Sequence, residues 1–430
     1  MKGMLFVTAG LGGMSGAQPK AGVISGVVSV CAEVNPHAAH KRHDQGWVDE
    51  IHEDLDVLIP RIRKAMEDKE VISIAYLGNV VDLWERLAEE NVHVDLGSDQ
   101  TSLHNPWAGG YYPVGYSYEE SNRMMAEEPE KFKECVQESL RRHAAAVNRL
   151  AEKGMYFFDY GNSFLKAVFD AGVKSICKNG ENDVDGFIFP SYVEDILGPC
   201  LFDFGYGPFR WCCLSRNPED LDKTDAAAAQ YILEHNRRYQ DYDNYVWCRD
   251  AKKNKLVVGT QCRILYQDAM GRMNIALKFN EMVRNGEIGP VMLGRDHHDT
   301  GGTDSPFRET SNIKDGSNIM ADMATQCFAG NAARGMSLIA LHNGGGTGIG
   351  KSINGGFGMV LDGSERVDTI LRMSMPWDTM VGVSRRAWAR NENAISTAKE
   401  YNELYADSDH ITLPVLADRE LVREVLKGRG

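Results

Sequence analysis

A glycine-rich segment near the start of the chain constrains its fold more than any other feature. The apolar run from Leu5 to Ala9 predicts a buried strand, and it leads directly into the sequence Gly-Leu-Gly-Gly-Met-Ser-Gly at residues 10–16. The small and apolar residues from Ala17 to Val30 predict a helix, which merges into a second strand over residues 27–33. A strand, a glycine turn and a helix in this order form the first unit of a doubly wound α/β fold.

The glycine segment has the chemistry of a dinucleotide-binding loop. Glycines permit a tight turn and let the backbone approach a pyrophosphate, while the helix N-terminus offers unpaired N–H groups and a partial positive charge. Glu33 ends the second strand, where a carboxylate accepts hydrogen bonds from ribose hydroxyls and repels the 2′-phosphate of NADP. Ser15 stands where the usual pattern has its third glycine, and a glycine turn without a ligand is the alternative interpretation.

The alternation of strands and helices continues through the first part of the chain. Further strands are predicted at residues 71–76, 93–96 and 155–159, and helices at 48–68 and 129–153. Such alternation implies parallel crossovers and an open α/β sheet, whose ligands bind beyond the carboxyl ends of the strands.

Aromatic and glycine-rich segments take over from about residue 185. Helical stretches at 225–240, 275–286 and 317–334 join them. We predict a Rossmann-like parallel-sheet NAD-binding domain over residues 1–187, followed by a mixed α/β core domain over residues 188–430.

Composition and charge exclude several classes of protein. The chain has 430 residues and a formal net charge of −14, which argues against a sequence-independent nucleic-acid binder because phosphates require clustered Lys and Arg. No apolar run approaches the roughly 20 residues that span a bilayer. The 9 cysteines are scattered and never spaced as CxxC, which predicts a reducing, cytoplasmic environment without a disulfide framework or a zinc site.

Later clusters carry further polar chemistry. The segments 295–302 and 305–310 are dense in ionisable groups, which favours an acid/base cluster with an Asp tuning a His. A surface salt-bridge network is the alternative, and a metal site is disfavoured because His297 and His298 point apart on a strand and no further ligand follows at the required spacing. Arg210 stands between aromatic residues, an environment that suits a carboxylate.

A second polyglycine loop at residues 341–350 lacks the ending of a phosphate-binding P-loop. It suits either the close approach of the backbone to a flat ligand or a tight structural turn.

Six motifs in order resemble the urocanase (urocanate hydratase) family. They are Phe6–Gln18, Asp95–Ser102, Gly207–Trp211, Arg295–Asp299, Ser305–Thr310 and His342–Gly346, and the phrase Asn354–Gly358 resembles the animal-type branch. The resemblance covers residue 3 to about residue 404. It implies a hydro-lyase that adds water to urocanate, giving 4-imidazolone-5-propanoate in histidine degradation, with tightly bound NAD+ as an electrophile instead of a hydride carrier. It also implies a homodimer.

The glycine loop and the resemblance together indicate the site residues. The expected NAD+ contacts are Gly10, Gly12, Gly13, Met14, Ser15, Glu33, Asn79, Val80, Gln100, Thr101, Ser102, Leu103, His104, Tyr111, Tyr112, Tyr160 and Gly346. The resemblance assigns the substrate carboxylate to Arg210 and Arg308. We expect Asp296, His297 and Asp299 to handle protons, and we expect no metal ion.

The chain departs from the family pattern in three places. The catalytic cysteine of bacterial-type members aligns near Leu265, and Cys262 lies three residues away, so that role is not transferred. A family arginine has no match at Ala38, although Arg42 is near. Family members carry well over a hundred further residues ahead of the first strand, so we expect the N-terminal half of the catalytic core to be absent from this chain. A second polypeptide would supply it, or the chain is a fragment, or hydratase activity is lost.

Two other functions fit part of the sequence. The glycine loop and Glu33 alone would equally support an NAD-dependent dehydrogenase. An N-terminally truncated, non-catalytic NAD-binding chain is the other alternative.

Overall fold

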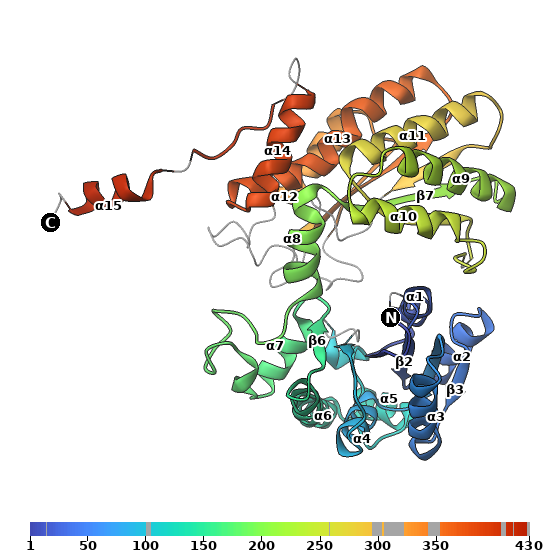
Figure 1. Ribbon diagram of the computed structural model, residues 1–430, viewed down its shortest axis with the longest axis vertical. Helices are drawn as coiled ribbons and strands as arrows, with labels where there is room; N and C mark the ends of the chain where they lie inside the picture. Colours follow the sequence, from blue (N-terminus) through green and yellow to red (C-terminus); the bar gives the residue numbers. More distant parts are fainter. Residues whose placement is uncertain are drawn as a thin grey trace.

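The chain forms two β-sheets that follow one another in sequence. The computed structural model describes residues 1–13, 15–99, 105–257, 259–294, 303–304, 322–342, 353–405, 410–415 and 417–427. Within these residues each sheet has six strands. Figure 1 shows the first sheet and its helices in blue to green and the second in green to red, with the segment around α8 (Gly198–Cys200) between them.

The first sheet is parallel throughout and has the strand order β3-β4-β2-β1-β5-β6. Its strands are β1 (Leu5–Ala9), β2 (Val28–Glu33), β3 (Glu50–His52), β4 (Ile72–Leu77), β5 (Leu96–Asp99) and β6 (Tyr156–Asp159). The order along the sheet reverses between β1 and β5, so a crevice opens where the carboxyl ends of these two strands diverge. The predicted Rossmann-like domain is confirmed.

Seven α-helices connect and cover these strands. They are α1 (Gln18–Ser25), α2 (Pro36–Asp44), α3 (Leu55–Glu67), α4 (Val80–Glu89), α5 (Tyr118–Glu127), α6 (Pro129–Ala151) and α7 (Ser163–Asp170). Capping side chains set the starts of four of them, α2 to α5: Asp54, for example, accepts the N–H of Asp56 ahead of α3, and Ser117 and Glu120 form a capping box at α5. Short 3-10 helices cover Ser15–Ala17, Pro106–Ala108, Lys174–Ile176 and Phe202–Phe204, and a π-helix covers Tyr192–Leu197.

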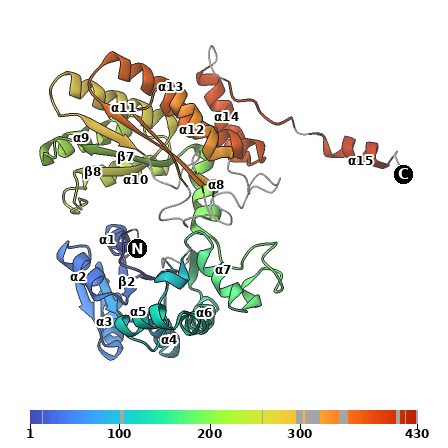
Figure 2. The ribbon, with the colours of Figure 1, turned by 180° about the vertical axis from the view of Figure 1, so that it is seen from behind.

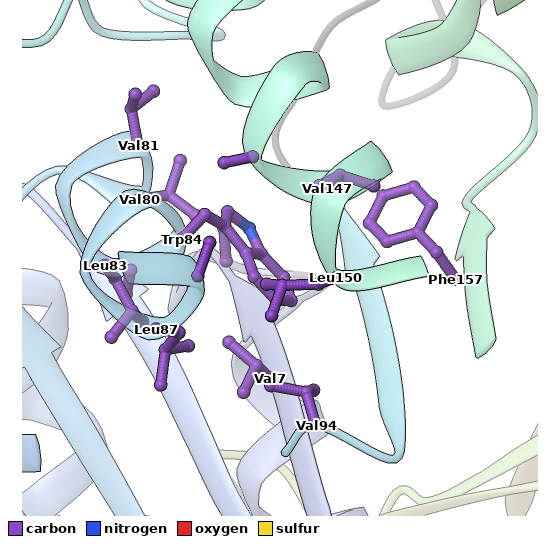
Figure 3. Packing of buried hydrophobic residues seen from close by; sticks show 14 of the residues in the cluster. Val7, Val80, Val81, Leu83, Trp84, Leu87, Val94, Val147, Leu150 and Phe157 are labelled. Atoms are coloured by element: carbon purple, nitrogen blue, oxygen red, sulfur yellow. The ribbon is translucent and has the colours of Figure 1, made fainter. Parts of the chain in front are cut away.

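Trp84 of α4 fills the space between the first sheet and α6. Figure 3 shows its indole among Val7, Leu150 and Phe157, and the rings of Trp84 and Phe157 meet edge to face with their centroids 6.3 Å apart. Gly97 of β5 lies beneath this ring: an added Cβ would be 2.8 Å from Met155 Sδ and 3.0 Å from Trp84 Cη2. Glycine at this position is therefore a requirement of packing.

Replacing Gly97 by alanine tests this packing. We expect Gly97→Ala to lower the free energy of unfolding by about 1–3 kcal/mol, because a close-packed interior has no room for an extra methyl group. Gly12→Ala is the matched control, since no described atom lies within 4 Å of its added carbon. Urea unfolding followed by circular dichroism measures both, and equal midpoints for the two variants would contradict the packing argument.

The second sheet is antiparallel. Its order is β10-β12-β9-β7-β8, and β11 pairs with β12. The strands are β7 (Gly207–Cys213), β8 (Cys262–Gln267), β9 (Val291–Gly294), β10 (Thr303–Asp304), β11 (Leu338–His342) and β12 (Ile353–Leu361). The helices are α9 (Pro218–Glu234), α10 (Tyr239–Arg249), α11 (Ala269–Arg284), α12 (Asp322–Ala333), α13 (Glu365–Trp388), α14 (Glu392–Leu404) and α15 (Arg419–Lys427).

Among the described residues, one face of this second sheet is covered more fully than the other. Phe209, Trp211 and Leu293 point into a core formed with α9, α11 and α13. In β8, buried residues alternate with half-buried ones, as expected for a sheet with two different faces. The mixed α/β character of the second part is confirmed, and the division between residues 187 and 188 stays a prediction.

The sequence patterns predicted the wrong bounds for three helices or strands. The helix predicted at 48–68 begins at Leu55, because Glu50–His52 pairs with β4 as a short edge strand. The strand predicted at 93–96 lies at Leu96–Asp99, since its pairing with β1 begins at Leu96. The stretch 225–240 is divided between α9 and α10.

The cysteines require a further correction. Cys212 of β7 and Cys262 of β8 form a disulfide, although we expected no disulfide framework. The two residues are separated by 50 positions and become neighbours only through the antiparallel register of the strands. Spacing along the sequence therefore could not reveal them.

Among the described residues, no helix has both the length and the apolar character that crossing a membrane requires.

Candidate functional site

A cavity of about 290 Å³ lies at the carboxyl edge of the first sheet. The sequence-predicted residues that line it come from the glycine loop, from the ends of β2 and β4, and from the segment before α5. They are Gly10, Gly12, Ser15, Glu33, Asn79, Val80, Tyr111 and Tyr112. Folding thus gathers positions about a hundred residues apart around one space.

The glycine loop is open on its outer side. Gly10 has a φ of 91°, and its N–H donates to the carbonyl of Ala32 at 2.8 Å, so the chain turns sharply out of β1. At Gly12 and Gly13, no described atom lies within 4 Å of an added Cβ. Packing within the described chain therefore does not require glycine there. An uncrowded glycine backbone beside a cavity fits a ligand whose pyrophosphate approaches the main chain.

Glu33 joins the glycine loop to the end of β2. Its Oε2 accepts the N–H of Leu11 at 2.6 Å, and its Oε1 accepts the N–H of Asn35 at 2.9 Å. Burial raises the pKa of this carboxyl group, and the N–H donors oppose the rise. Each carboxylate oxygen can accept a further hydrogen bond, so Glu33 can both hold the loop and receive ribose hydroxyls.

Arg42 holds the other side of the same loop. From α2, its Nε donates to the carbonyl of Leu11 at 3.1 Å, and a terminal nitrogen donates to the carbonyl of Gly12. Its side chain is buried, and an added Cβ on Gly16 would lie 2.1 Å from Arg42 Nε. The arginine thus donates to two carbonyls of the loop. The loop can pass this close to the arginine only because residue 16 is glycine.

Asn79 and Tyr112 fix the wall of the cavity opposite the loop. Asn79 caps α4 by accepting the N–H of Val81, and its Nδ2 donates to the carbonyl of Tyr112, both at 2.9 Å. The hydroxyl of Tyr112 donates to Asn122 at 2.9 Å. These bonds anchor the segment before α5 on the cavity.

Tyr111 anchors that segment from behind. Its hydroxyl lies 3.0 Å from Nδ1 of His143, and both side chains are buried in the core between α4 and α6. Burial lowers the pKa of His143 to about 3, so the imidazole stays neutral. His143 gave no signal in the sequence, because a histidine on an apolar helix face has no recognisable partner before the fold brings Tyr111 to it.

Tyr160 lies outside the lining of the cavity, and its NAD+ contact stays a prediction. Its ring stacks on Tyr192 with centroids 5.9 Å apart, in an apolar cluster with Val193 and Leu197, and it does not line the cavity. Several other predicted positions lie outside the described residues. These are Met14, Gln100, Thr101, Ser102, Leu103, His104, Asp296, His297, Asp299, Arg308 and Gly346.

Arg210 lies on the less covered face of the second sheet. It is exposed on β7, directly opposite Gly294 of β9. A Cβ added to Gly294 would approach only the carbonyl oxygen of Phe357, at 3.5 Å, among the described atoms. The neighbouring strand therefore presents no side chain directly opposite Arg210, which suits a planar ligand with a carboxylate. Gly294 also leads directly into the predicted acid/base segment at 295–302.

Comparison with known proteins decides the family. The urocanase Rossmann-like domain model matches residues 1–196, and the urocanase C-terminal domain model matches residues 200–400. The chain belongs to the urocanase family. Members of this family bind NAD+.

Curated relatives of this urocanase-family chain are similar over nearly its whole length. A probable urocanate hydratase of Caenorhabditis elegans is 51% identical over 434 residues, which cover 99% of this chain and 64% of the relative. A urocanate hydratase of Mus musculus is 49% identical over 445 residues, covering 99% of this chain and 65% of the relative. The chain therefore spans slightly less than two thirds of the length of these relatives.

The urocanase-family domain also holds two buried carboxyl groups that sequence reasoning missed. Asp99 and Asp159 end β5 and β6 as register partners, and each is 1% exposed. Asp159 Oδ2 accepts the N–H of Leu165 at 3.1 Å. Burial raises the pKa of Asp159 to about 8; the N–H of Leu165 opposes this rise, and the charge of Asp99 adds to it. Only the pairing of the strands brings the two groups together.

Asp159 makes stability depend on pH. With its pKa near 8, the native state keeps a proton that the unfolded chain releases above about pH 4, so stability falls as pH rises between these values. We expect Asp159→Asn to remove this loss. One pKa unit corresponds to about 1.4 kcal/mol. Between pH 5 and 8, the free energy of unfolding should therefore fall in wild type by at least about 1.4 kcal/mol more than it does in the variant.

Urea unfolding at several pH values measures the difference. Asp185→Asn, at an exposed position, is the control that should follow wild type. Parallel pH profiles for wild type and Asp159→Asn would contradict the assignment.

Proposed function

We propose that this chain binds NAD+ in the cavity at the carboxyl edge of its first sheet. The observation that carries the proposal is the uncrowded backbone at Gly12 and Gly13 beside a cavity that Glu33 also lines. The loop backbone would receive the pyrophosphate, and Glu33 would accept ribose hydroxyls. The orienting contacts are already made, since Glu33 and Arg42 hold the loop from two sides.

We further propose that the chain serves a urocanate hydratase, which adds water to urocanate to give 4-imidazolone-5-propanoate. Relatives named urocanate hydratase, at 49–51% identity, support this reaction. Arg210, with Arg308 as a second anchor, would hold the substrate carboxylate, and Asp296, His297 and Asp299 would move protons. When bound, NAD+ would supply an electron-accepting nicotinamide ring. By the same resemblance we propose a homodimer, and the absence of CxxC spacing among the cysteines is the basis on which we propose a cytoplasmic location.

An assay with urocanate and NAD+ tests the reaction. The expected result is loss of the ultraviolet absorbance of urocanate without accumulation of NADH, because water addition leaves the cofactor's oxidation state unchanged. NADH formed in proportion to product would select a dehydrogenase instead. NAD+ binding without any turnover, even when the N-terminal segment of a relative is added, would overturn the hydratase proposal and leave cofactor binding in place.

Two substitutions should separate the cofactor site from the substrate site. Gly13→Val places side-chain carbons where the pyrophosphate would approach, so we expect NAD+ affinity to fall more than about tenfold, the equivalent of one or two lost backbone hydrogen bonds. Arg210→Ala should leave NAD+ affinity unchanged and lower kcat/KM for urocanate by about 10–100-fold, the cost of a lost charged hydrogen bond.

Calorimetric titration with NAD+ and steady-state kinetics measure these effects, and each variant is the control for the other. Undiminished NAD+ binding by Gly13→Val would contradict the assignment of the loop. An unchanged rate for Arg210→Ala would contradict the assignment of the carboxylate.

A further inference from the structure

Trp47 lies where the part of the chain that forms the first sheet touches the part that forms the second sheet. Its indole Nε1–H donates at 3.0 Å to the carbonyl of Lys255, a residue 208 positions later in the chain. The neighbouring Gly46 packs against the same lysine, since an added Cβ would be 3.0 Å from Lys255 Nζ. In Figures 1 and 2 the loop that follows α10 extends toward α1 and α2, which shows how the two segments meet.

The same tryptophan is connected to the glycine loop. The guanidinium of Arg42 lies over the ring of Trp47, 5.5 Å from its centroid, and the carbonyl of Arg42 accepts the N–H of Trp47 at 2.9 Å. Arg42 in turn donates to the carbonyls of Leu11 and Gly12. A change in the position or mobility of these loop carbonyls is therefore transmitted to Trp47 through one buried side chain.

On the other side, the Lys255 turn is anchored to the sheet that carries Arg210. The carbonyl of Leu256 accepts a hydrogen bond at 2.5 Å from Arg263 of β8. Arg263 pairs with Asp225 of α9 at 2.7 Å, and both side chains are buried. Because β8 pairs with β7 beside Arg210, the turn is tied to the strand that bears this arginine.

We propose that Trp47 is a positioning residue that couples occupancy of the glycine loop to the order of the segment 250–256 and, through it, to the second sheet. The inference rests on the proposed binding of NAD+. A bound pyrophosphate would fix the loop N–H groups and so reduce the freedom of the carbonyls that Arg42 holds. With Arg42 and Trp47 fixed, the Lys255 turn loses mobility without any large displacement, which is a coupling through conformational freedom.

Hydrogen exchange on the full chain tests this coupling. Trp47→Phe keeps an aromatic ring beneath Arg42 and removes only the indole donor to Lys255. Trp107→Phe is the matched control, because Trp107 also has a cation over its ring, Lys133 at 5.5 Å, but forms no hydrogen bond to the second sheet or its helices among the described residues. The reporters are the amides of Asn254, Lys255 and Leu256, which donate to backbone carbonyls within the turn.

Saturating NAD+ should slow hydrogen exchange of these amides about fivefold in wild type and in Trp107→Phe, because strengthening one hydrogen bond has an effect of this size. In Trp47→Phe the slowing should be lost, although the variant still binds NAD+. Since coupling between two sites is reciprocal, calorimetry should show its NAD+ affinity falling by no more than the same factor. Thermal unfolding midpoints should be equal for both variants, which separates coupling from loss of structure.

Two outcomes would overturn the inference while leaving the proposed function standing. One is equal slowing in Trp47→Phe and wild type, which would make the contact a structural one alone. The other is NAD+ binding by wild type without any change in the segment 250–256. Absence of NAD+ binding by wild type would instead overturn the proposed function, and the coupling with it.

Discussion

The structure around the site depends on how two charged groups, the half-buried Glu33 and the buried Arg42, hold the glycine loop. Glu33 accepts the N–H of Leu11, while Arg42 takes the carbonyls of Leu11 and Gly12. Buried peptide groups are costly when unpaired, and a loop this rich in glycine has few side chains to hold its own shape. Glu33 accepts from a loop N–H and Arg42 donates to loop carbonyls, so both kinds of peptide group are paired from outside the loop. The outer surface of the loop at Gly12 and Gly13 is left open toward a ligand.

The two sheets divide the chemistry of the site. The parallel sheet presents backbone groups and one carboxylate, which suit a dinucleotide, whereas the antiparallel sheet presents Arg210 opposite a glycine, which suits a planar carboxylate. A reaction between cofactor and substrate requires both molecules to be held in a fixed relative orientation, which neither sheet can provide alone. The contact of Trp47 with Lys255 is therefore of functional interest as well as structural.

Much of the first sheet could be predicted because its signals are local. The strand Leu5–Ala9, the glycine loop after it and the helix that follows are visible in periodicity and composition, and the parallel order then follows from alternation. The strand Glu50–His52 was missed because three residues carry no pattern and pair only at the sheet edge. The NAD+ contact of Tyr160 stays a prediction, because a residue after a strand end can face either the cavity or a neighbouring apolar cluster.

The sequence alone determined the fold class, the glycine loop with its acidic partner, and the family to which the motifs belong, since all of these depend on residues close together or on recognisable phrases. Tertiary structure decided the pairs: Tyr111 with His143, Asp99 with Asp159, Cys212 with Cys262, and the hold of Arg42 on Leu11. Taken alone, none of these residues carries a sequence signal that identifies its partner. Burial and strand register bring them into contact, and neither is specified by any short stretch of chain.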